Sequence, residues 1–159
     1  MTLTIGRWGE YQSIIWKNSE GKQYVIMINT VSRLAFVEPL LKSPYTTFKK
    51  IIKAASDNNQ PITKLQINKE VESYKDYFQN IPYITLNNNF HSLGMAFQLG
   101  NQLRLSNSNS TREIHKFVQD WNNKKHSNTK IEPTRVNSED FMKIQAETYI
   151  RELKQKLKK

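Results

Sequence analysis

Residues 24–40, with the sequence YVIMINTVSRLAFVEPL, decide the fold that we expect for this chain. The apolar run at residues 23–28 lacks helical spacing, which predicts a β-strand buried on both faces of a sheet. A second apolar run at residues 34–40 has a proline near its end, which predicts the other strand of a hairpin-like pair. Residues 11–16 are expected to form a first strand, and residues 18–21 supply the turn that joins it to the pair. Three consecutive strands are therefore expected to open the fold.

The later apolar runs are separated by helical patterns. Short strands are expected at residues 65–67 and 81–86, with a brief helix near residues 71–78 between them. Three leading strands followed by strands that helices separate give an α/β arrangement. The ribonuclease H-like fold has this order, so we expect a mixed five-stranded sheet flanked by helices.

Two amphipathic helices are expected from their first residues and their apolar spacing. Ser43 before Pro44 predicts an N-cap followed by proline at the first helical position. Ser110 with Glu113 predicts a capping box, in which each side chain satisfies the other residue's free backbone N–H. Apolar residues then recur at i, i+3, i+4 and i+7 in both helices. They are Phe48, Ile51, Ile52 and Ala55 in the first helix, and Ile114, Phe117, Val118 and Trp121 in the second.

The chain is strongly basic, with a net charge of +10 from 24 Lys and Arg against 14 Asp and Glu. Such an excess favours polyanionic partners, because cationic side chains displace the counterions of a phosphate backbone. A last helix is expected from Asn137 or Ser138, with Met142, Ala146, Tyr149 and Leu153 on one face. Basic residues crowd its end: Arg151, Lys154, Lys156, Lys158 and Lys159. This helix fits a DNA-binding arm, a partner-binding helix or a solvated tail, and the sequence leaves these alternatives open.

Composition excludes several other classes of protein. No apolar run approaches the roughly 20 residues that span a bilayer, and residues 1–10 lack the layout of a secretory signal. The chain has no cysteine, which excludes disulfides and thiolate metal sites and is typical of a reducing compartment. We therefore expect an intracellular protein without a membrane partner, and a nucleus or a site of viral replication is compatible with the sequence.

Three segments carry a family resemblance. Residues 24–40 are similar to a pattern in which an apolar run, Asp-Val-Phe-Ser-Arg and an aromatic residue lead to a closing Pro-Leu. Residues 65–72 resemble a strand that ends in Thr-Asp-Asn-Gly-x-Glu-Phe. Residues 121–136, which include Trp121-Asn122 and His126-Ser127, resemble Tyr-Asn-x-x-x-His-Ser…Thr-Pro-x-x-Val. These patterns, in this order, resemble the catalytic core of retroviral-type integrases and DDE transposases, above all those of retroelements and of Polinton- or Maverick-like DNA transposons.

The resemblance also implies where catalytic acids would stand. In that family three carboxylates hold two divalent metal ions, which drive phosphoryl transfer. The resemblance puts Tyr11 at the first acid position, Asn68 at the second and Phe97 at the third. None of the three is acidic, and no Asp or Glu occurs between Asp76 and Glu113. It therefore implies an integrase core without its metal site, which needs no cofactor and is not an enzyme.

The sequence contains acids and histidines that define two other candidate metal sites. A relocated site would use Glu10, Glu70 and Glu72 and would make the protein a cryptic nuclease. Glu10 is one residue from the expected position, and a one-residue shift turns a strand side chain to the opposite face. The two other acids lie at an exposed helix start, where acids are favourable in any case. The histidines match no zinc spacing and are expected to be surface or capping residues: His91, His115 and His126.

These expectations combine into one hypothesis and one alternative. Residues 1–136 would form the integrase-core-like domain, and residues 137–159 the basic helix. The protein would be a catalytically inactive, dimeric scaffold that contacts DNA without sequence preference or serves an assembly. The alternative is a protein-interaction or structural factor, viral or domesticated, that does not bind DNA. Expected DNA contacts are Lys124 and Lys125 and the basic residues of the last helix; expected dimer contacts are Phe48, Ile52, Ile114, Phe117 and Trp121.

Overall fold

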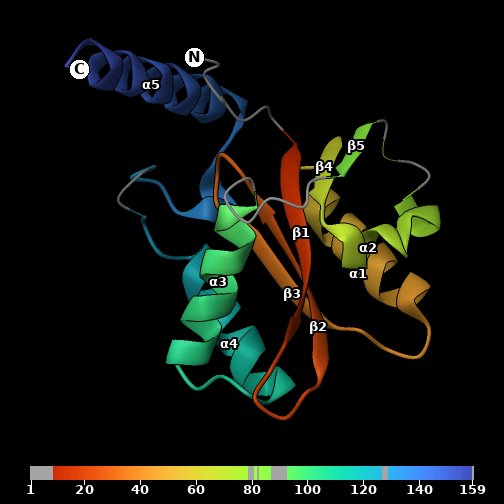
Figure 1. Ribbon diagram of the computed structural model, residues 1–159. Helices are drawn as coiled ribbons and strands as arrows, with labels where there is room; N and C mark the ends of the chain where they lie inside the picture. Colours follow the sequence, from red (N-terminus) through yellow and green to blue (C-terminus); the bar gives the residue numbers. More distant parts are fainter. Residues whose placement is uncertain (1–8, 79–80, 82, 87–92, 127–128, 159) are drawn as a thin grey trace.

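The computed structural model describes residues 9–78, 81, 83–86, 93–126 and 129–158 (Figure 1). Its centre is a five-stranded mixed sheet with the strand order β3-β2-β1-β4-β5. The strands are β1 (Glu10–Lys17), β2 (Gln23–Asn29), β3 (Ala35–Pro39), β4 (Lys64–Ile67) and β5 (Tyr83–Leu86). The first three pair antiparallel, β4 runs parallel to β1, and β5 runs parallel to β4. The expectation of a mixed five-stranded sheet flanked by helices is confirmed.

Helices cover both faces of this sheet, with α1 and α2 on one side and α3 and α4 on the other (Figure 1). The helical elements are α1 (Pro44–Asp57), α2 (Lys69–Glu72), η1 (Lys75–Phe78), α3 (Gly94–Leu105), α4 (Thr111–Asn122), η2 (Pro133–Arg135) and α5 (Ser138–Leu157). Ser110 and Glu113 form the expected capping box of α4. Asn137 begins α5 with a second capping box, formed with Asp140. Ser43 does occupy the N-cap of α1, but its hydroxyl makes no capping hydrogen bond.

The strand β2 shows why the sheet needs helices on both faces. Its side chains alternate between two core clusters, and both clusters are buried. Val25 and Met27 pack toward α1, while Tyr24, Ile26 and Ile28 pack toward α3 and α4. Burying one such aliphatic side chain contributes roughly 2 kcal/mol. The expectation of a strand buried on both faces is confirmed.

Burial corrects part of the expected dimer interface. Phe48 and Ile114 are both 0% exposed, because each packs into a core cluster of its own chain. Neither side chain can contact a partner subunit, so they are removed from the interface. Ile52, Phe117 and Trp121 are partly buried against the same clusters and keep some exposed surface.

The helix α5 is attached to the rest of the fold by its first two turns. Phe141 and Ile144 pack with Val31 and Val136 in a third, smaller cluster. The later turns extend away from the sheet, at the top of Figure 1. Packing therefore continues from residues 1–136 into the start of the helix. Among the described residues, no helix is both long enough and apolar enough to cross a membrane.

Candidate functional site

The side chains of β1 point alternately to the two faces of the sheet, so only some of the expected acid positions lie on the same face as α3. Tyr11 lies on the face that packs against α1, and its hydroxyl donates a hydrogen bond to the backbone oxygen of Gln60 (2.6 Å). Phe97 lies on α3 and packs against the cluster on the opposite face of the sheet. Tyr11 is therefore separated from Phe97 by the sheet itself. The assignment of Tyr11 to the first acid position is corrected, because an acid there would point away from α3.

Gln12 is the β1 residue that faces α3. Its side-chain oxygen accepts hydrogen bonds from the backbone N–H groups of Met95 (3.1 Å) and Ala96 (3.2 Å). These groups belong to the first turn of α3, where free N–H groups and the helix dipole attract negative charge. A neutral, buried amide satisfies them instead of a carboxylate. Gln12 could not be identified from the sequence, because β1 is buried on both faces and no alternation marks the side that faces α3.

Glu10 lies on the same face of β1 as Gln12, so it faces the α3 side of the sheet. It is buried, it accepts a hydrogen bond from the side-chain amide of Gln66, and its Oε1 lies 3.9 Å from Lys64 Nζ. This carboxylate is therefore already engaged with two side chains of β4. Within the described ranges, no three His, Cys, Asp or Glu residues come together in a group that could hold a metal ion.

Asn68, at the second acid position, has a structural role. It is the N-cap of α2, and its side-chain oxygen accepts a hydrogen bond from the backbone N–H of Val71 (3.0 Å). Asparagine is among the preferred N-cap residues, so the amide suits this place without any metal ion. Glu70 and Glu72 lie in the first turn of this helix, and Glu70 is exposed. The residues at this end of β4 do not fit a divalent metal site.

The closing motif holds α4 against the edge strand β3. The side-chain amide of Asn122 donates to the backbone oxygen of Ala35 (2.8 Å) and accepts from its N–H (2.9 Å). Trp121 donates its indole N–H to the backbone oxygen of Arg33 (2.7 Å), and His126 packs against the same indole ring. The asparagine thus takes the place of a neighbouring strand along β3. The most specific part of the family resemblance consequently serves stability in this chain.

Of the two remaining histidines the structure describes only His115, and it lies in no group that could hold a metal ion. His115 Nε2 lies 3.1 Å from Glu38 Oε2, and Lys50 Nζ lies 3.2 Å from the same oxygen. Glu38 and His115 border a groove of about 270 Å³ between β3 and α4. That volume is slightly below the range of typical ligand pockets, roughly 300–1,000 Å³. His91 lies outside the described residues.

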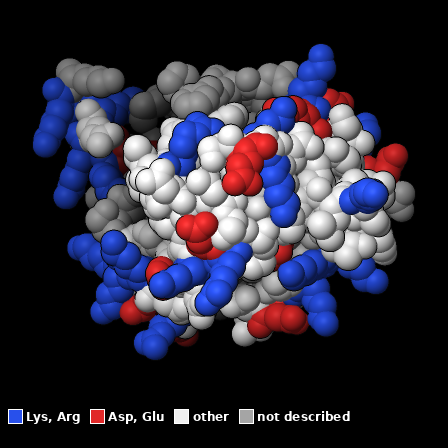
Figure 2. All heavy atoms as spheres, turned by 90° about the horizontal axis from the view of Figure 1, so that it is seen from below, with Lys and Arg blue, Asp and Glu red and all other residues white. Residues whose placement is uncertain are grey.

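The expected DNA-contacting residues lie on two separate segments. Lys124 and Lys125 are exposed in the turn after α4. The basic residues of α5 that the structure describes are also exposed: Arg151, Lys154, Lys156 and Lys158. Lys159 lies outside the described residues. Figure 2 shows Lys and Arg around the rim of one face of the molecule, with Asp and Glu between them, so the positive charge is dispersed there.

Two arginines approach each other where α5 meets the β2–β3 turn. The pKa of the Arg33 guanidinium is lowered by burial, and the charge of Arg151 lowers it further. Arg33 donates to the backbone oxygen of Thr30, which fixes its orientation. Two neighbouring cations disfavour each other, and an anion bound between them would relieve this repulsion. The charge of Arg151 therefore acts on Arg33, which is itself largely buried.

Burial also raises the pKa of the Tyr11 hydroxyl. The unfolded state ionises near the ordinary tyrosine pKa of about 10, while the folded state resists ionisation. This group should therefore stabilise the fold fully below that pH, and its contribution should be lost as the pH rises above it.

We expect Tyr11→Phe to lower the free energy of unfolding by about 1–2 kcal/mol at pH 7, because the Gln60 carbonyl loses its donor. Urea unfolding measures the difference in the free energy of unfolding between the variant and the wild type, and this difference should shrink above pH 10. A difference that stays constant from pH 8 to 11 would contradict this account.

Comparison with models of known protein families finds no match for the chain, and comparison with curated proteins finds no significant relative.

Proposed function

We propose that this chain is a catalytically inactive, integrase-like core with a ribonuclease H-like fold that associates with DNA as a scaffold. Three antiparallel strands followed by two parallel strands, with helices on both faces, support the fold assignment. The order and spacing of the three similar segments support the family. Fold alone does not establish function, so the proposal rests on what occupies the positions that the resemblance assigns to catalytic acids.

The contact between Gln12 and the first turn of α3 carries the non-enzymatic part of this proposal. Metal-ion catalysis needs several carboxylates that converge on one point. Here the β1 residue facing α3 is an amide bound to backbone N–H groups, Asn68 caps α2, and Phe97 is partly buried against a core cluster. Glu10 is held by side chains of β4. Each of these positions has a structural role in the fold, which supports a core without a metal site.

The DNA-associated part follows from the distribution of charge. An exposed basic helix contacts phosphates without reading base edges, so the binding should be tolerant of sequence. Arg33, whose guanidinium is oriented by the backbone oxygen of Thr30, adds a positive charge close enough to Arg151 to be affected by it. Lys124 and Lys125 extend the basic surface from a different segment. DNA would thus be held by its backbone, with the core serving as the support for α5.

Acidic residues introduced at the three expected acid positions test the integrase-like assignment. They also test whether the first acid belongs at Gln12, on the side of β1 that faces α3. We expect the wild type to show no Mn²⁺-dependent rise in melting temperature and no Mg²⁺- or Mn²⁺-dependent DNA cleavage. The triple variant Gln12→Asp, Asn68→Asp and Phe97→Glu should gain a Mn²⁺-dependent rise of a few degrees, because ligand binding stabilises the folded state. The matched variant with Tyr11→Asp in place of Gln12→Asp should gain none, and its buried charge should lower stability.

Either of two results would count against this part of the proposal. Metal-dependent cleavage by the wild type, lost in Glu10→Gln, would establish the cryptic nuclease instead. A folded triple variant that ignores Mn²⁺ would remove the support for an integrase-like arrangement.

A second candidate function is protein interaction without DNA binding. The observation in its favour is a row of large apolar side chains exposed on α5, including Met142, Ile150 and Leu157. Surfaces of this kind are enriched at sites of protein association. Affinity for DNA at low salt separates this candidate from the first.

A further inference from the structure

The strand β3 lies at one edge of the sheet, and its hydrogen bonds to β2 show which of its backbone groups point outward. The backbone oxygen of Leu34 accepts a hydrogen bond from the last residue of β2, and the N–H of Leu40 donates to the first residue of β2. Pairing alternates along an antiparallel ladder, so residues 34, 36, 38 and 40 direct their backbone groups to β2. The residues that direct their backbone groups to the outer edge are Ala35, Val37 and Pro39.

Two of these three residues are satisfied by side chains of the same chain. Asn122 binds both the N–H and the C=O of Ala35. Pro39 has no N–H, and its oxygen accepts a hydrogen bond from the Thr47 hydroxyl (2.9 Å). Among the described residues, none forms a hydrogen bond with the outward N–H and C=O of Val37. Val37 is only 1% exposed, so this donor and acceptor are buried without partners, which is unfavourable unless a ligand supplies them.

This unpaired donor and acceptor belong to a residue that lines the groove between β3 and α4. The strand contributes Val37 among others, and α4 contributes residues of one helix face: His115, Val118, Gln119 and Asn122. At one end of the groove Asn122 reaches Ala35, and at the other end His115 reaches Glu38. The middle of this helix face therefore lies level with Val37.

We propose that the groove binds a short extended peptide segment of a partner protein, one residue of which exchanges both backbone hydrogen bonds with Val37. Asn122 shows the chemistry that such a ligand needs, because its carboxamide carries the donor and the acceptor of a peptide group and satisfies Ala35. An extended peptide directs the N–H and the C=O of one residue to the same side, as a neighbouring strand does. Asn122 and Thr47 occupy the edge on either side of Val37, so only one residue of the peptide can pair in this way.

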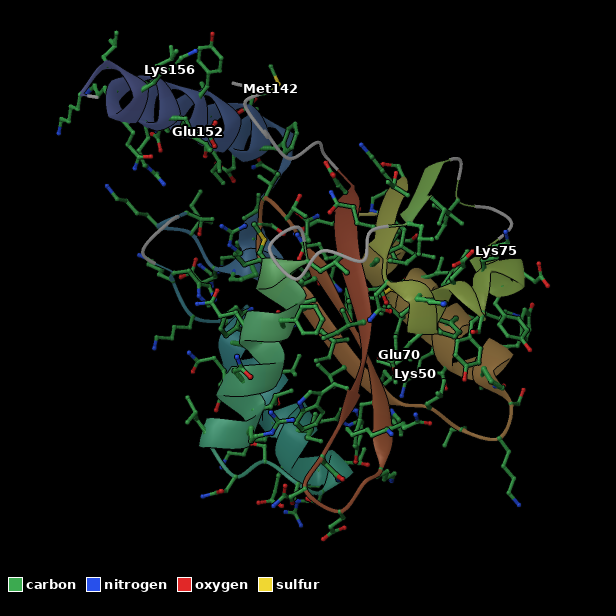
Figure 3. All side chains as sticks on the ribbon, viewed as in Figure 1. Lys50, Glu70, Lys75, Met142, Glu152 and Lys156 are labelled. Atoms are coloured by element: carbon green, nitrogen blue, oxygen red, sulfur yellow. The ribbon has the colours of Figure 1, made fainter. Side chains whose placement is uncertain are left out.

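The charges at the groove favour a peptide over a nucleic acid. Among the described residues that line it there is no Lys or Arg, and Glu38 contributes a carboxylate. A phosphate would approach this carboxylate, which is unfavourable. Lys50, which lies 3.2 Å from Glu38, is far from the residues of α5 that Figure 3 labels. The groove is thus separate from the helix to which DNA contacts are assigned, and this proposal does not depend on DNA binding.

Surface side chains at the rim of the groove control access to Val37. The side chain of His115 is 43% exposed, and Gln119 is exposed as well. A peptide reaches the floor of the groove when such side chains change rotamer, a change that is common at interfaces whose backbone does not move. The fold of β3 and α4 can therefore stay as it is when the peptide binds.

Peptide selection followed by NMR tests the site. Acetylated and amidated hexapeptides of random sequence are selected against the full chain, and we expect the best of them to bind with a dissociation constant of about 10–100 µM. The backbone amide of Val37 should be among the resonances that shift most. Methylation of one peptide nitrogen should weaken binding at least about fivefold, because the bond to the Val37 oxygen is lost. Methylation of the residue on either side, whose N–H points away, should have a smaller effect.

A filled groove provides the matched variant. Gln119→Trp places a large side chain in the groove and should weaken binding of the selected peptide at least about tenfold. Asp120→Trp changes the next residue of α4, which is exposed and does not line the groove, and should leave binding unchanged. Circular dichroism should show the same helix content in all three proteins.

Three results would overturn the proposal. The first is that no selected peptide binds more tightly than about 1 mM. The second is that the selected peptides bind Gln119→Trp as tightly as the wild type, which would place them elsewhere on the surface. The third is that a single-stranded oligonucleotide shifts the Val37 amide when no peptide does, which would assign the groove to a nucleic acid.

Discussion

Gln60→Leu should lower the free energy of unfolding by about 3 kcal/mol or more, the largest effect of any single change considered for this fold. Gln60 is fully buried and joins three segments that are far apart in sequence. Its side-chain nitrogen donates to the backbone oxygen of Pro133 (2.7 Å), its side-chain oxygen accepts from the hydroxyl of Ser32, and its backbone oxygen accepts from Tyr11. Leucine has a similar size but leaves the Ser32 hydroxyl and the Pro133 carbonyl buried without these partners.

Urea unfolding at pH 7 measures this effect, with the dependence on denaturant expected to stay the same. Gln98→Leu, at an exposed position of α3, is the matched control and should change stability by less than about 0.5 kcal/mol. A loss below 1 kcal/mol for Gln60→Leu would mean that the hydrogen bonds linking the β2–β3 turn to residues 133–136 contribute little. The attachment of α5 would then need another explanation.

Removing basic side chains from α5 should produce the largest functional change. The triple variant Arg151→Gln, Lys156→Gln and Lys158→Gln should lower affinity for duplex DNA at low salt on the order of 100-fold. The slope of log affinity against log salt should also become less steep by about 3, because up to three phosphate contacts are lost.

The control for this experiment carries the same change in net charge elsewhere. Lys42→Gln, Lys49→Gln and Lys53→Gln remove three exposed lysines in and just before α1, far from α5 along the chain. We expect less than about a threefold loss of affinity for this variant. Equal losses for the two triple variants would show that only net charge matters, and the assignment of DNA contacts to α5 would be wrong.

The hairpin-like pair and the helix starts could be predicted from the sequence, because local patterns determine them. The run at residues 23–28 identified β2, and Ser110 with Glu113 identified the first turn of α4. The identity of the β1 residue facing α3 could not be predicted. Since β1 is buried on both faces, its apolar residues show no alternation, and only packing against α3 distinguishes Tyr11 from Gln12.

The same limit applies wherever distant segments meet. The grouping of Met142, Tyr149 and Leu153 on one face of α5 followed from helical spacing. That this face points to solvent, while Phe141 and Ile144 point to the core, depends on Val31 in a turn more than a hundred residues earlier. The pairing of Asn122 with the backbone of Ala35 is equally long-range. The spacing of apolar residues predicts which side chains share one face of a helix or strand. Only tertiary packing determines whether that face contacts the core or solvent.

The most direct test of the proposed function is the affinity of the wild type for fluorescently labelled duplex DNA across a salt series, with and without Mg²⁺ and Mn²⁺. Fluorescence anisotropy should show binding that is tolerant of sequence, weakens steeply as salt increases and is indifferent to either metal. The slope of log affinity against log salt should correspond to about four or more phosphate contacts. Absence of binding even at low salt would contradict the DNA-associated scaffold and favour the protein-interaction factor.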